Sequence, residues 1–500
     1  MTPDVPAWVR DAVFYQIFPD RFAASDRVIK PGPMETWDAP PTVHGFKGGD
    51  LLGIAEHLGY LEDLGVTAIY LTPIFSSASN HRYHTYDYYT VDPLLGGNDA
   101  LRELLDAAHD RGMRVVLDGV FNHSGRGFWP FHHVLETGLA SPYRSWFWID
   151  EAMLEAEGHL HAYPEPGDRS TRLGYQGWWN LPDLPKLNTN APQVREYLFG
   201  VAEHWLRFGI DGWRLDVPTE IDDEAFWQEF RARCRAVNPE AYLVGEIWQV
   251  APAWLRGDRF DAQMNYQLAE AILGFAAGAD LDHEVIAGHG MYKNDLRPMT
   301  GTSFGLRVEE LSTAYDPAVV SAQLNLLGSH DTPRLRTVVG GGLERARLAT
   351  LLQLTLPGAP CIYYGDEIGL SGGNDSACRG AFPWDETRWE PGMRDSVQGL
   401  LHLRHAEAAL RDGQIRVVGA SDAAVALERG AGVSRFVVAA NASAEPVRLD
   451  LSFADAAPGA GGHLAPIALP GFDGVAESPI VDGRARLDMA PRTSAILRVV

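Results

Sequence analysis

Cysteine, long apolar runs and basic residues are all scarce in this sequence of 500 residues. The three cysteines, Cys234, Cys361 and Cys378, are an odd number without the spacing of metal ligands, so we expect neither a disulfide framework nor a cysteine-based metal site. No apolar run is long enough to span a bilayer. Residues 1–20 lack the cationic start and apolar core of a signal peptide. We therefore expect a cytoplasmic protein with reduced thiols and no membrane partner.

The shortage of positive charge narrows the choice of partners. Lysine and arginine number 42 against 66 acidic residues, which gives a formal charge of -24. Such a surface repels the phosphates of nucleic acids and anionic lipids, and no basic arm relieves that repulsion. The composition therefore predicts no nucleic-acid partner and is compatible with a neutral substrate.

Short apolar runs rich in β-forming residues alternate with helical patterns along most of the chain. The runs are "AVFYQIF", "TAIYLTPI", "RVVLDGVF", "IDGWRLDV", "AYLVGEIW", "FDAQMNY", "SAQLNLLGSH" and "APCIYYGDEIG". One helical face lies between the third and fourth runs, where apolar residues recur at spacings of four and three: Val194, Leu198, Val201, Trp205 and Phe208. The alternation predicts an α/β fold with parallel strands, and eight units favour a (β/α)8 TIM barrel over an open doubly wound sheet.

Two stretches break this rhythm and define the predicted domains. Residues 122–186 are rich in aromatics, glycine and proline and are too long for a simple loop, which predicts a subdomain inserted after strand three. The barrel then comprises residues 1–121 and 187–412. From residue 413 to residue 500, alternating segments such as "RFVVAANA" and "PVRLDLSF" predict a C-terminal antiparallel β domain.

Four predicted strands each deliver a carboxylate at the same end. The residues are Asp118 after "RVVL", Asp216 after "WRL", Glu246 after "YLVG" and Asp331 after "LLGSH". Any one of them alone is readily explained as a turn or helix-capping acid. Because the active site of such a barrel lies at the carboxyl ends of its strands, four together favour a catalytic site.

The arginine in "WRLDV" indicates how these acids differ. Arg214 and Asp216 share one face of their strand, and a neighbouring cation favours an ionised carboxylate, although a structural ion pair explains the two residues equally well. Glu246 is followed by Ile247 and Trp248, a less polar setting that we expect to raise its pKa. One ionised and one protonated carboxyl group are what a glycosidase needs as nucleophile and general acid.

The stretches "DGVFNH", "LPKLN", "GIDGWRLDV", "GEIW", "LLGSHD" and "YYGDEIGL" resemble the signature regions of the α-amylase family, glycoside hydrolase family 13, over roughly residues 11–410. "LPKLN" and "GGNDSACRGAFPWDE" further resemble the branch of neopullulanase, cyclomaltodextrinase and maltogenic amylase. The resemblance implies the same barrel, insertion and C-terminal β domain. Because the first strand starts near residue 11, the N-terminal β domain of that branch is expected to be lacking, which leaves open a monomer or a homodimer.

The resemblance also implies residue roles. It makes Asp216 the nucleophile, Glu246 the acid/base and Asp331 the acid that grips the hydroxyls of the distorted sugar. It assigns substrate binding to further residues: Tyr83, His123, Arg214, His330, Asp375 and Arg379. Structural histidines and a surface ion pair between Asp375 and Arg379 are the alternatives. No cofactor is expected to be required; some relatives bind calcium through the asparagine that matches Asn122, but no acidic calcium loop is visible.

These residues predict a retaining α-glucan hydrolase that acts on maltooligosaccharides, with starch, pullulan or cyclodextrins as further substrates. A glucosyl transferase using the same donors and a non-catalytic sugar-binding relative are the alternatives; the presence of all three acids argues against the second. "VPTE" stands where "VANE" is usual after the nucleophile, and His84 stands where an aspartate is common. Both differences leave the balance of α-1,4 and α-1,6 cleavage open.

Overall fold

The computed structural model describes residues 3–165, 167–168, 170–411, 414–432, 434–453 and 462–500. Its central sheet has eight parallel strands in the order β8-β7-β6-β5-β2-β1-β10-β9. They are β1 (Phe14–Ile17), β2 (Ala68–Leu71), β5 (Arg114–Gly119), β6 (Gly212–Leu215), β7 (Tyr242–Gly245), β8 (Ala262–Gln263), β9 (Leu324–Leu326) and β10 (Ala359–Tyr363). A parallel bridge between Met264 and Leu324 joins the two ends of that order. The ring is therefore closed, which confirms the (β/α)8 barrel over the open sheet.

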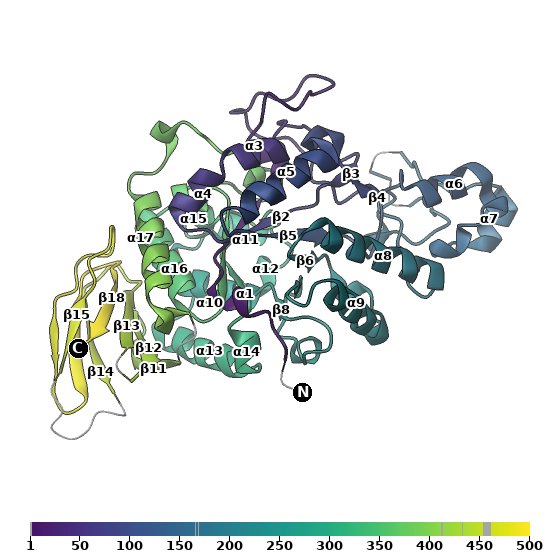
Figure 1. Cartoon of the computed structure of the whole chain (residues 1–500). Coiled ribbons are helices and arrows are strands. Elements are labelled where there is room, and N and C mark those ends of the chain that lie inside the picture. The colour runs from purple at the N-terminus through teal and green to yellow at the C-terminus, as the bar shows by residue number, and fades with distance from the viewer. Residues whose placement is uncertain (1–2, 166, 169, 412–413, 433, 454–461) are drawn as a thin grey trace.

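Helices surround the strands (Figure 1). The predicted helical face lies on α8, where four of the five apolar residues are buried and Phe208 is half-buried. The helices are α1 (Ala7–Asp11), α2 (Pro19–Phe22), α3 (Leu51–Glu56), α4 (Leu58–Leu64), α5 (Gly97–His109), α6 (Trp129–Thr137), α7 (Glu151–Glu157), α8 (Pro192–Phe208), α9 (Glu224–Val237), α10 (Tyr266–Ala277), α11 (His283–Ala287), α12 (Tyr292–Asp295), α13 (Gly301–Thr313), α14 (Pro317–Val320), α15 (Leu335–Val338), α16 (Leu343–Thr355) and α17 (Met393–Ala406). No helix within the described part of the chain combines the length and the apolar character that crossing a membrane requires.

Side chains inside the barrel change character along each strand. Near the amino ends of the strands, inward-facing side chains form a buried apolar cluster that includes Phe14, Val116, Val244, Leu324 and Cys361. Because side chains alternate with period two, the next inward positions are two residues further along. There the side chains are polar and buried: Gln16, Asp118 and Glu246. The apolar cluster thus closes the bottom of the barrel and positions a polar site at its carboxyl end.

The stretch between β5 and α8 contains α6 and α7 and projects from one side of the barrel (Figure 1). A bridge between His123 and Lys186 joins its two ends. A hairpin of β3 (Phe75–Ser77) and β4 (Thr85–Val91), which follows β2, was not identified in the sequence. We call residues 122–186 the insertion below.

The C-terminal strands form a separate antiparallel unit at the opposite side of the molecule (Figure 1). They are β11 (Ile415–Ala420), β12 (Ala424–Ala431), β13 (Ser434–Asn441), β14 (Val447–Ser452), β15 (Gly462–Pro466), β16 (Ser478–Ile480), β17 (Arg484–Met489) and β18 (Ser494–Val499). The unit is tied to the barrel helices: the backbone N–H of Val417 donates to Glu309 at 3.0 Å, and Nε of Arg429 donates to the carbonyl of Thr355 at 2.7 Å. The predicted boundary between residues 412 and 413 lies outside the described residues.

Candidate active site

The four predicted carboxylates meet at the carboxyl ends of the barrel strands. Asp118 lies at the end of β5, Asp216 follows β6, Glu246 follows β7 and Asp331 follows β9. The parallel ladder continues past the strand ends, since the backbone N–H of Asp216 donates to Gly119 at 3.1 Å and that of Glu246 donates to Leu215 at 3.0 Å. The ladder therefore fixes the two residues on neighbouring strands.

A single guanidinium lies between three of these acids. Nη1 of the fully buried Arg214 is 2.9 Å from Oδ1 of Asp118 and 3.0 Å from Oδ1 of Asp216. Its Nη2 is 2.9 Å from Oε2 of Glu246. The Arg214–Asp216 pair expected from the sequence is present, but it is one part of a buried cluster of one cation and three carboxyl groups.

Sharing the cation changes the expected ionisation of Asp216. Burial raises the pKa of Asp216 well above its usual range; Arg214 opposes the rise, and the carboxylates of Glu246 and Asp118 add to it. Arg214 thus favours the ionised form of Asp216, as the sequence predicts, while burial and the neighbouring acids give the pKa a net rise. One guanidinium divided among three acids does not outweigh their desolvation and mutual repulsion. Oδ2 of Asp216 accepts no hydrogen bond from any described residue.

Glu246 has the direction of pKa shift that the sequence predicts, but for a partly different reason. Burial raises its pKa, Arg214 opposes this and Asp331 adds to the rise. Trp248, expected to supply an apolar wall, instead donates from Nε1 to Oε1 of Glu246 at 3.2 Å, and its ring stacks on Tyr266 at a centroid distance of 3.5 Å. Trp248 therefore orients the carboxyl group and lowers its pKa slightly rather than raising it.

Val217 supplies a second donor to Glu246. Its backbone N–H lies 3.1 Å from Oε2 of Glu246, and its φ of 34° and ψ of 52° lie in the left-handed region. This conformation is costly for a β-branched residue and occurs where surrounding structure enforces it, often at functional sites. The strained residue directly after Asp216 thus links the backbone of one acid to the side chain of the other.

Asp331 differs electrostatically from the other acids. Burial acts to raise its pKa, but His330, Arg379 and Arg214 together lower it below its usual range. Oδ2 of Asp331 lies 3.1 Å from Nε2 of His330, and Oδ1 lies 3.3 Å from Nη2 of Arg379. Arg379 also contacts Asp375 at 3.1 Å, while Asp375 itself is 49% exposed. The Asp375–Arg379 pair therefore extends from the surface to Asp331, unlike an isolated surface ion pair.

Tyr83 and His330 form the floor beside Asp118. The hydroxyl of Tyr83 donates to Oδ2 of Asp118 at 2.9 Å and is 2.6 Å from Nε2 of His330, and the two rings are nearly parallel at 9°. Nδ1 of His330 is 2.8 Å from Nε2 of Gln16. Burial lowers the pKa of His330 to about 3, so the ring is neutral at physiological pH.

His123 begins an aromatic row that leads to the surface. Its ring stacks on Trp178 at 4.9 Å, Trp178 stacks on Trp179 at 4.5 Å, and Trp179 is 75% exposed. Burial lowers the pKa of His123 to about 3, and its Nε2 has no hydrogen-bond partner among the described residues. The row therefore connects the exposed Trp179 through Trp178 to the buried His123.

Sequence reasoning missed three neighbours of the acids. Tyr70 donates from its hydroxyl to Oδ2 of Asp118 at 2.6 Å, Gln16 contacts His330, and Nε2 of His289 lies 2.9 Å from the backbone carbonyl of Asp331. For Tyr70 and Gln16 a signal existed, because both are polar residues at inward positions near the ends of their strands. His289 lies outside the strands and carried no such signal.

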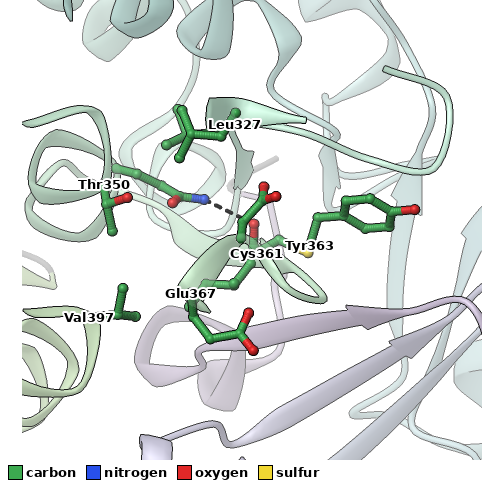
Figure 2. Close-up of a pocket in the computed structure, with 10 residues that line it drawn as sticks. Leu327, Thr350, Cys361, Tyr363, Glu367 and Val397 are labelled. Atoms are coloured by element: carbon green, nitrogen blue, oxygen red, sulfur yellow. Dashed lines mark hydrogen bonds between the residues drawn. The ribbon is translucent and has the colours of Figure 1, made fainter. Parts of the chain in front are cut away.

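The acids of "YYGDEIGL" lie behind the barrel wall, away from this cluster. Figure 2 shows Glu367 beside a cavity of about 10 Å³, which can hold at most one water molecule and no sugar. Glu367 accepts hydrogen bonds from the hydroxyls of Tyr15 and Tyr60 at 2.8 and 2.7 Å. Burial raises the pKa of Asp366, which lines the same cavity, to about 7. This signature stretch is therefore structural.

Asn122, which matches a calcium ligand of some relatives, is buried at the start of the insertion. Its Oδ1 has no hydrogen-bond partner among the described residues, but its Nδ2 contacts His123 at 3.3 Å, and its carbonyl accepts from the N–H of Leu187. Calcium takes six to eight oxygen ligands. Within the described parts of the chain, no trio of acidic, histidine or cysteine side chains includes a neighbour of Asn122. We derive no catalytic step through this ion.

Comparison with known proteins agrees with this geometry. The catalytic domain of the α-amylase family matches residues 16–408. A cyclomaltodextrinase of Geobacillus thermopakistaniensis is 46% identical over 419 residues, which are 83% of this chain and 66% of that protein. The chain thus spans about two thirds of the length of such curated relatives, which also include neopullulanase and maltogenic amylases.

Solved structures match over the whole length. Ttha1563 from Thermus thermophilus is 47% identical with a TM-score of 0.88 and covers 99% of this chain and 100% of its own. The debranching enzyme from Nostoc punctiforme is 44% identical with a TM-score of 0.86, and the match covers 100% of both chains. With its barrel, its cluster of acids and these relatives, the chain belongs to the α-amylase family, in the branch of cyclomaltodextrinase, neopullulanase and maltogenic amylase.

Proposed function

We propose that this protein is a retaining α-glucan hydrolase that cleaves maltooligosaccharides by double displacement. One observation carries the proposal: Asp216 and Glu246 contact the two terminal nitrogens of the same buried guanidinium, while Oδ2 of Asp216 has no partner among the described residues. An acid pair on neighbouring strands, with one free oxygen on the first, is suited to direct attack on a sugar. We expect their carboxyl groups to lie about 5 to 5.5 Å apart, as in retaining enzymes.

The first half of the reaction uses each acid once. Oδ2 of Asp216 attacks the anomeric carbon of the bound sugar, and the bonding electrons of the scissile bond move to the leaving oxygen. Glu246 gives its proton to that oxygen, and its raised pKa keeps this proton available. In the substrate-free site Oδ2 of Asp216 has no hydrogen-bond partner among the described residues. In the complex, a substrate hydroxyl or the leaving oxygen next to Glu246 fills that space. The products are a glycosyl ester on Asp216 and a shortened glucan.

The second half reverses the roles. Glu246, now ionised, removes a proton from water, and the water oxygen attacks the anomeric carbon and releases Asp216. Arg214 stabilises whichever acid is ionised, because it contacts both. Asp331, whose pKa is lowered, remains a hydrogen-bond acceptor for sugar hydroxyls throughout. The neutral His123 and His330 bind hydroxyls without adding charge.

The proposed substrates are neutral α-glucans. The exposed Trp179 and the row behind it offer flat apolar surfaces that suit the C–H face of a pyranose. Similarity to a cyclomaltodextrinase and to a debranching enzyme supports both α-1,4 and α-1,6 linkages as substrates. The products from maltotriose, pullulan and β-cyclodextrin measure this range. A cytoplasmic location is proposed with it, in keeping with three free, buried cysteines.

A test with two variants assigns the roles of the acids. Glu246→Gln should lose about 10² to 10⁴-fold in rate on maltotriose, because a sugar leaving group needs protonation. On an activated aryl α-glucoside it should still form the glycosyl ester, which is β-linked, and added azide should displace Asp216 from that ester to give an α-glycosyl azide. Asp216→Asn should form no ester on either substrate. If azide instead yields the α-glycosyl azide with Asp216→Asn and the β-glycosyl azide with Glu246→Gln, the roles proposed here are exchanged and the assignment is wrong.

A transferase is the second candidate, because it shares the glycosyl ester and differs only in the acceptor. Product analysis at high maltose distinguishes the two, since a transferase yields longer glucans where a hydrolase yields glucose and maltose.

A further inference from the structure

The insertion contains a cluster of metal-ligand side chains far from the catalytic acids in sequence. Glu157 is the last residue of α7, and His159 and His161 follow it at intervals of two. The ligand atoms of the three side chains all lie within 4.8 Å of one another. Nε2 of His161 is 2.6 Å from a carboxylate oxygen of Glu157, and the two imidazole rings are 4.7 Å apart.

The backbone around this cluster favours convergence of the three side chains. Gly158 adopts a left-handed conformation with φ of 77° and ends α7, so the chain reverses direction directly after Glu157. The N–H of His161 then donates to the carbonyl of Leu173 at 2.9 Å, which fixes the returning segment. The arrangement therefore depends on backbone hydrogen bonds as well as on the side chains.

A hydrogen bond also selects the nitrogen that His159 presents, whereas Nε2 of His161 would exchange its proton for the metal. Nδ1 of His159 lies 2.9 Å from the backbone carbonyl of Glu157. A carbonyl only accepts, so Nδ1 donates and Nε2 of His159 keeps its lone pair. Metal-bound histidines commonly use their second nitrogen in this way, which fixes the ring and its tautomer.

We propose that Glu157, His159 and His161 form a binding site for a zinc ion, with water completing the coordination shell. Two imidazole nitrogens and one carboxylate oxygen are ligands that zinc prefers, whereas calcium and magnesium prefer oxygen alone. Bonds of about 2.0 to 2.2 Å in a tetrahedral shell place ligand atoms about 3.3 Å apart. The ligand atoms of His161 and Glu157 are 2.6 Å apart and all three lie within 4.8 Å of one another, so small side-chain rotations suffice.

The position of the site indicates a structural role. Zinc would join the end of α7 to the segment that follows it. In that segment the carbonyl of Ala162 accepts from Nη1 of Arg126 at 2.6 Å, and Arg126 also forms an ion pair with Asp183. Asp183 lies three residues after the 3-10 helix Trp178–Asn180, which contains Trp178 and Trp179. Bound zinc would therefore stabilise the part of the insertion that carries the aromatic row, independently of the proposed hydrolysis.

The experiment measures zinc binding and thermal unfolding in chelator-treated protein. When zinc is added back and the excess is removed, wild type should bind one zinc ion per chain, and zinc should raise its unfolding midpoint. His159→Ala and His161→Ala should bind zinc at least about tenfold more weakly and show no rise. His132→Ala is the matched control, because His132 also pairs with a glutamate four residues away, Glu136, at 3.6 Å but without a third ligand.

Three results would overturn the proposal. The first is a wild-type protein that binds no zinc, and the second is equal zinc binding by all four proteins. The third is an unfolding midpoint that calcium raises as much as zinc does, with both rises lost in His159→Ala and His161→Ala. The midpoints of the metal-free proteins should be equal, because these side chains are solvent-accessible. If the metal-free variants are themselves less stable, zinc content alone decides between the outcomes.

Discussion

The two ends of the barrel interior are built from the same strands, yet one is apolar and the other is charged. On β5, Val116 belongs to the apolar end and Asp118 to the charged end; the corresponding residues are Val244 on β7 and Glu246 directly after it. Each pair is separated by only two residues, which is one step of the inward-facing period. On these two strands the change from apolar to acidic thus takes a single step of that period.

This difference separates stability from chemistry. Burial of apolar side chains stabilises the fold, whereas burial of three carboxyl groups around one cation opposes it. The raised pKa values of Asp216 and Glu246 express that opposition directly. We infer that the apolar end offsets the cost of the charged end, so substitutions at the two levels should affect different measurements.

The largest expected effect follows from removal of the shared cation. Arg214→Ala should lower kcat by on the order of 10² to 10³-fold, because among the described residues only Arg214 forms ion pairs with both Asp216 and Glu246 and can stabilise their changing charges. Steady-state kinetics on maltotriose and thermal unfolding measure the two effects side by side. The loss of stability should be limited, since the acids can bind protons when the cation is gone.

Leu324→Ala at the apolar end is the matched comparison. It should cost about 2 to 5 kcal/mol of unfolding free energy and leave kcat of the folded protein nearly unchanged. Arg214→Lys should restore little activity, because an ammonium lacks the fork that reaches three acids. A collapse of stability in Arg214→Ala with normal turnover of the folded fraction would mean that the charged end is structural.

The sequence predicts where along each strand the inward-facing residues change from apolar to acidic, because that position depends on periodicity alone. Parallel strands and period two fix that Asp118, Asp216 and Glu246 emerge at one end, so all eight strands and the positions of the acids were predictable. The sequence did not predict which acids contact Arg214, because those contacts depend on side-chain rotamers and on the packing between strands. Trp248 illustrates the limit: its position next to Glu246 was known, but the direction of its N–H was not.

Backbone conformation is a second feature that could not be predicted from the sequence. Valine has a high propensity for β-strands, and nothing in "DVPTE" indicates the left-handed conformation of Val217. The hairpin of β3 and β4 and the convergence of Glu157 with two histidines likewise depend on turns that bring side chains together. Local patterns predict elements better than they predict such convergence.

An intermediate effect is expected in the pH dependence of stability. Because the pKa of Asp216 is raised in the folded protein, the folded state holds its proton more tightly than the unfolded state. This contribution to stability is complete below the unfolded pKa, about 3.9, and is lost as the pH rises through the folded pKa. Asp216→Asn, which cannot ionise, should therefore melt at a higher temperature than wild type at pH 7, and the difference should shrink near pH 4.

Asp331→Asn should show the opposite sign. The lowered pKa of Asp331 contributes stability above the unfolded pKa, and that contribution is lost as the pH falls. The variant should melt below wild type at pH 7 and approach it in acid. Asp26→Asn, on the exposed surface, is the control and should change little at either pH. Equal shifts for Asp216→Asn and Asp331→Asn would contradict the electrostatic difference between them.

The smallest expected effect belongs to Tyr70, which lies on the border between the two ends. Its ring packs in the apolar cluster, while its hydroxyl donates to Asp118 at 2.6 Å. Tyr70→Phe keeps the ring and removes one of the donors to Asp118, which retains Tyr83 and Arg214. We expect a cost of about 1 kcal/mol in unfolding free energy and a fall in kcat of less than about tenfold.

Tyr242→Phe removes an equivalent hydroxyl from the apolar end, where it donates to the carbonyl of Ala322 at 2.7 Å. Chemical denaturation should give the two variants similar costs, because each loses one buried hydrogen bond. Only Tyr70→Phe should change kcat, since only its hydroxyl is linked through Asp118 and Arg214 to Asp216. If Tyr242→Phe lowers kcat as much as Tyr70→Phe does, the apolar end also takes part in positioning the acids, and the division between the two ends does not hold.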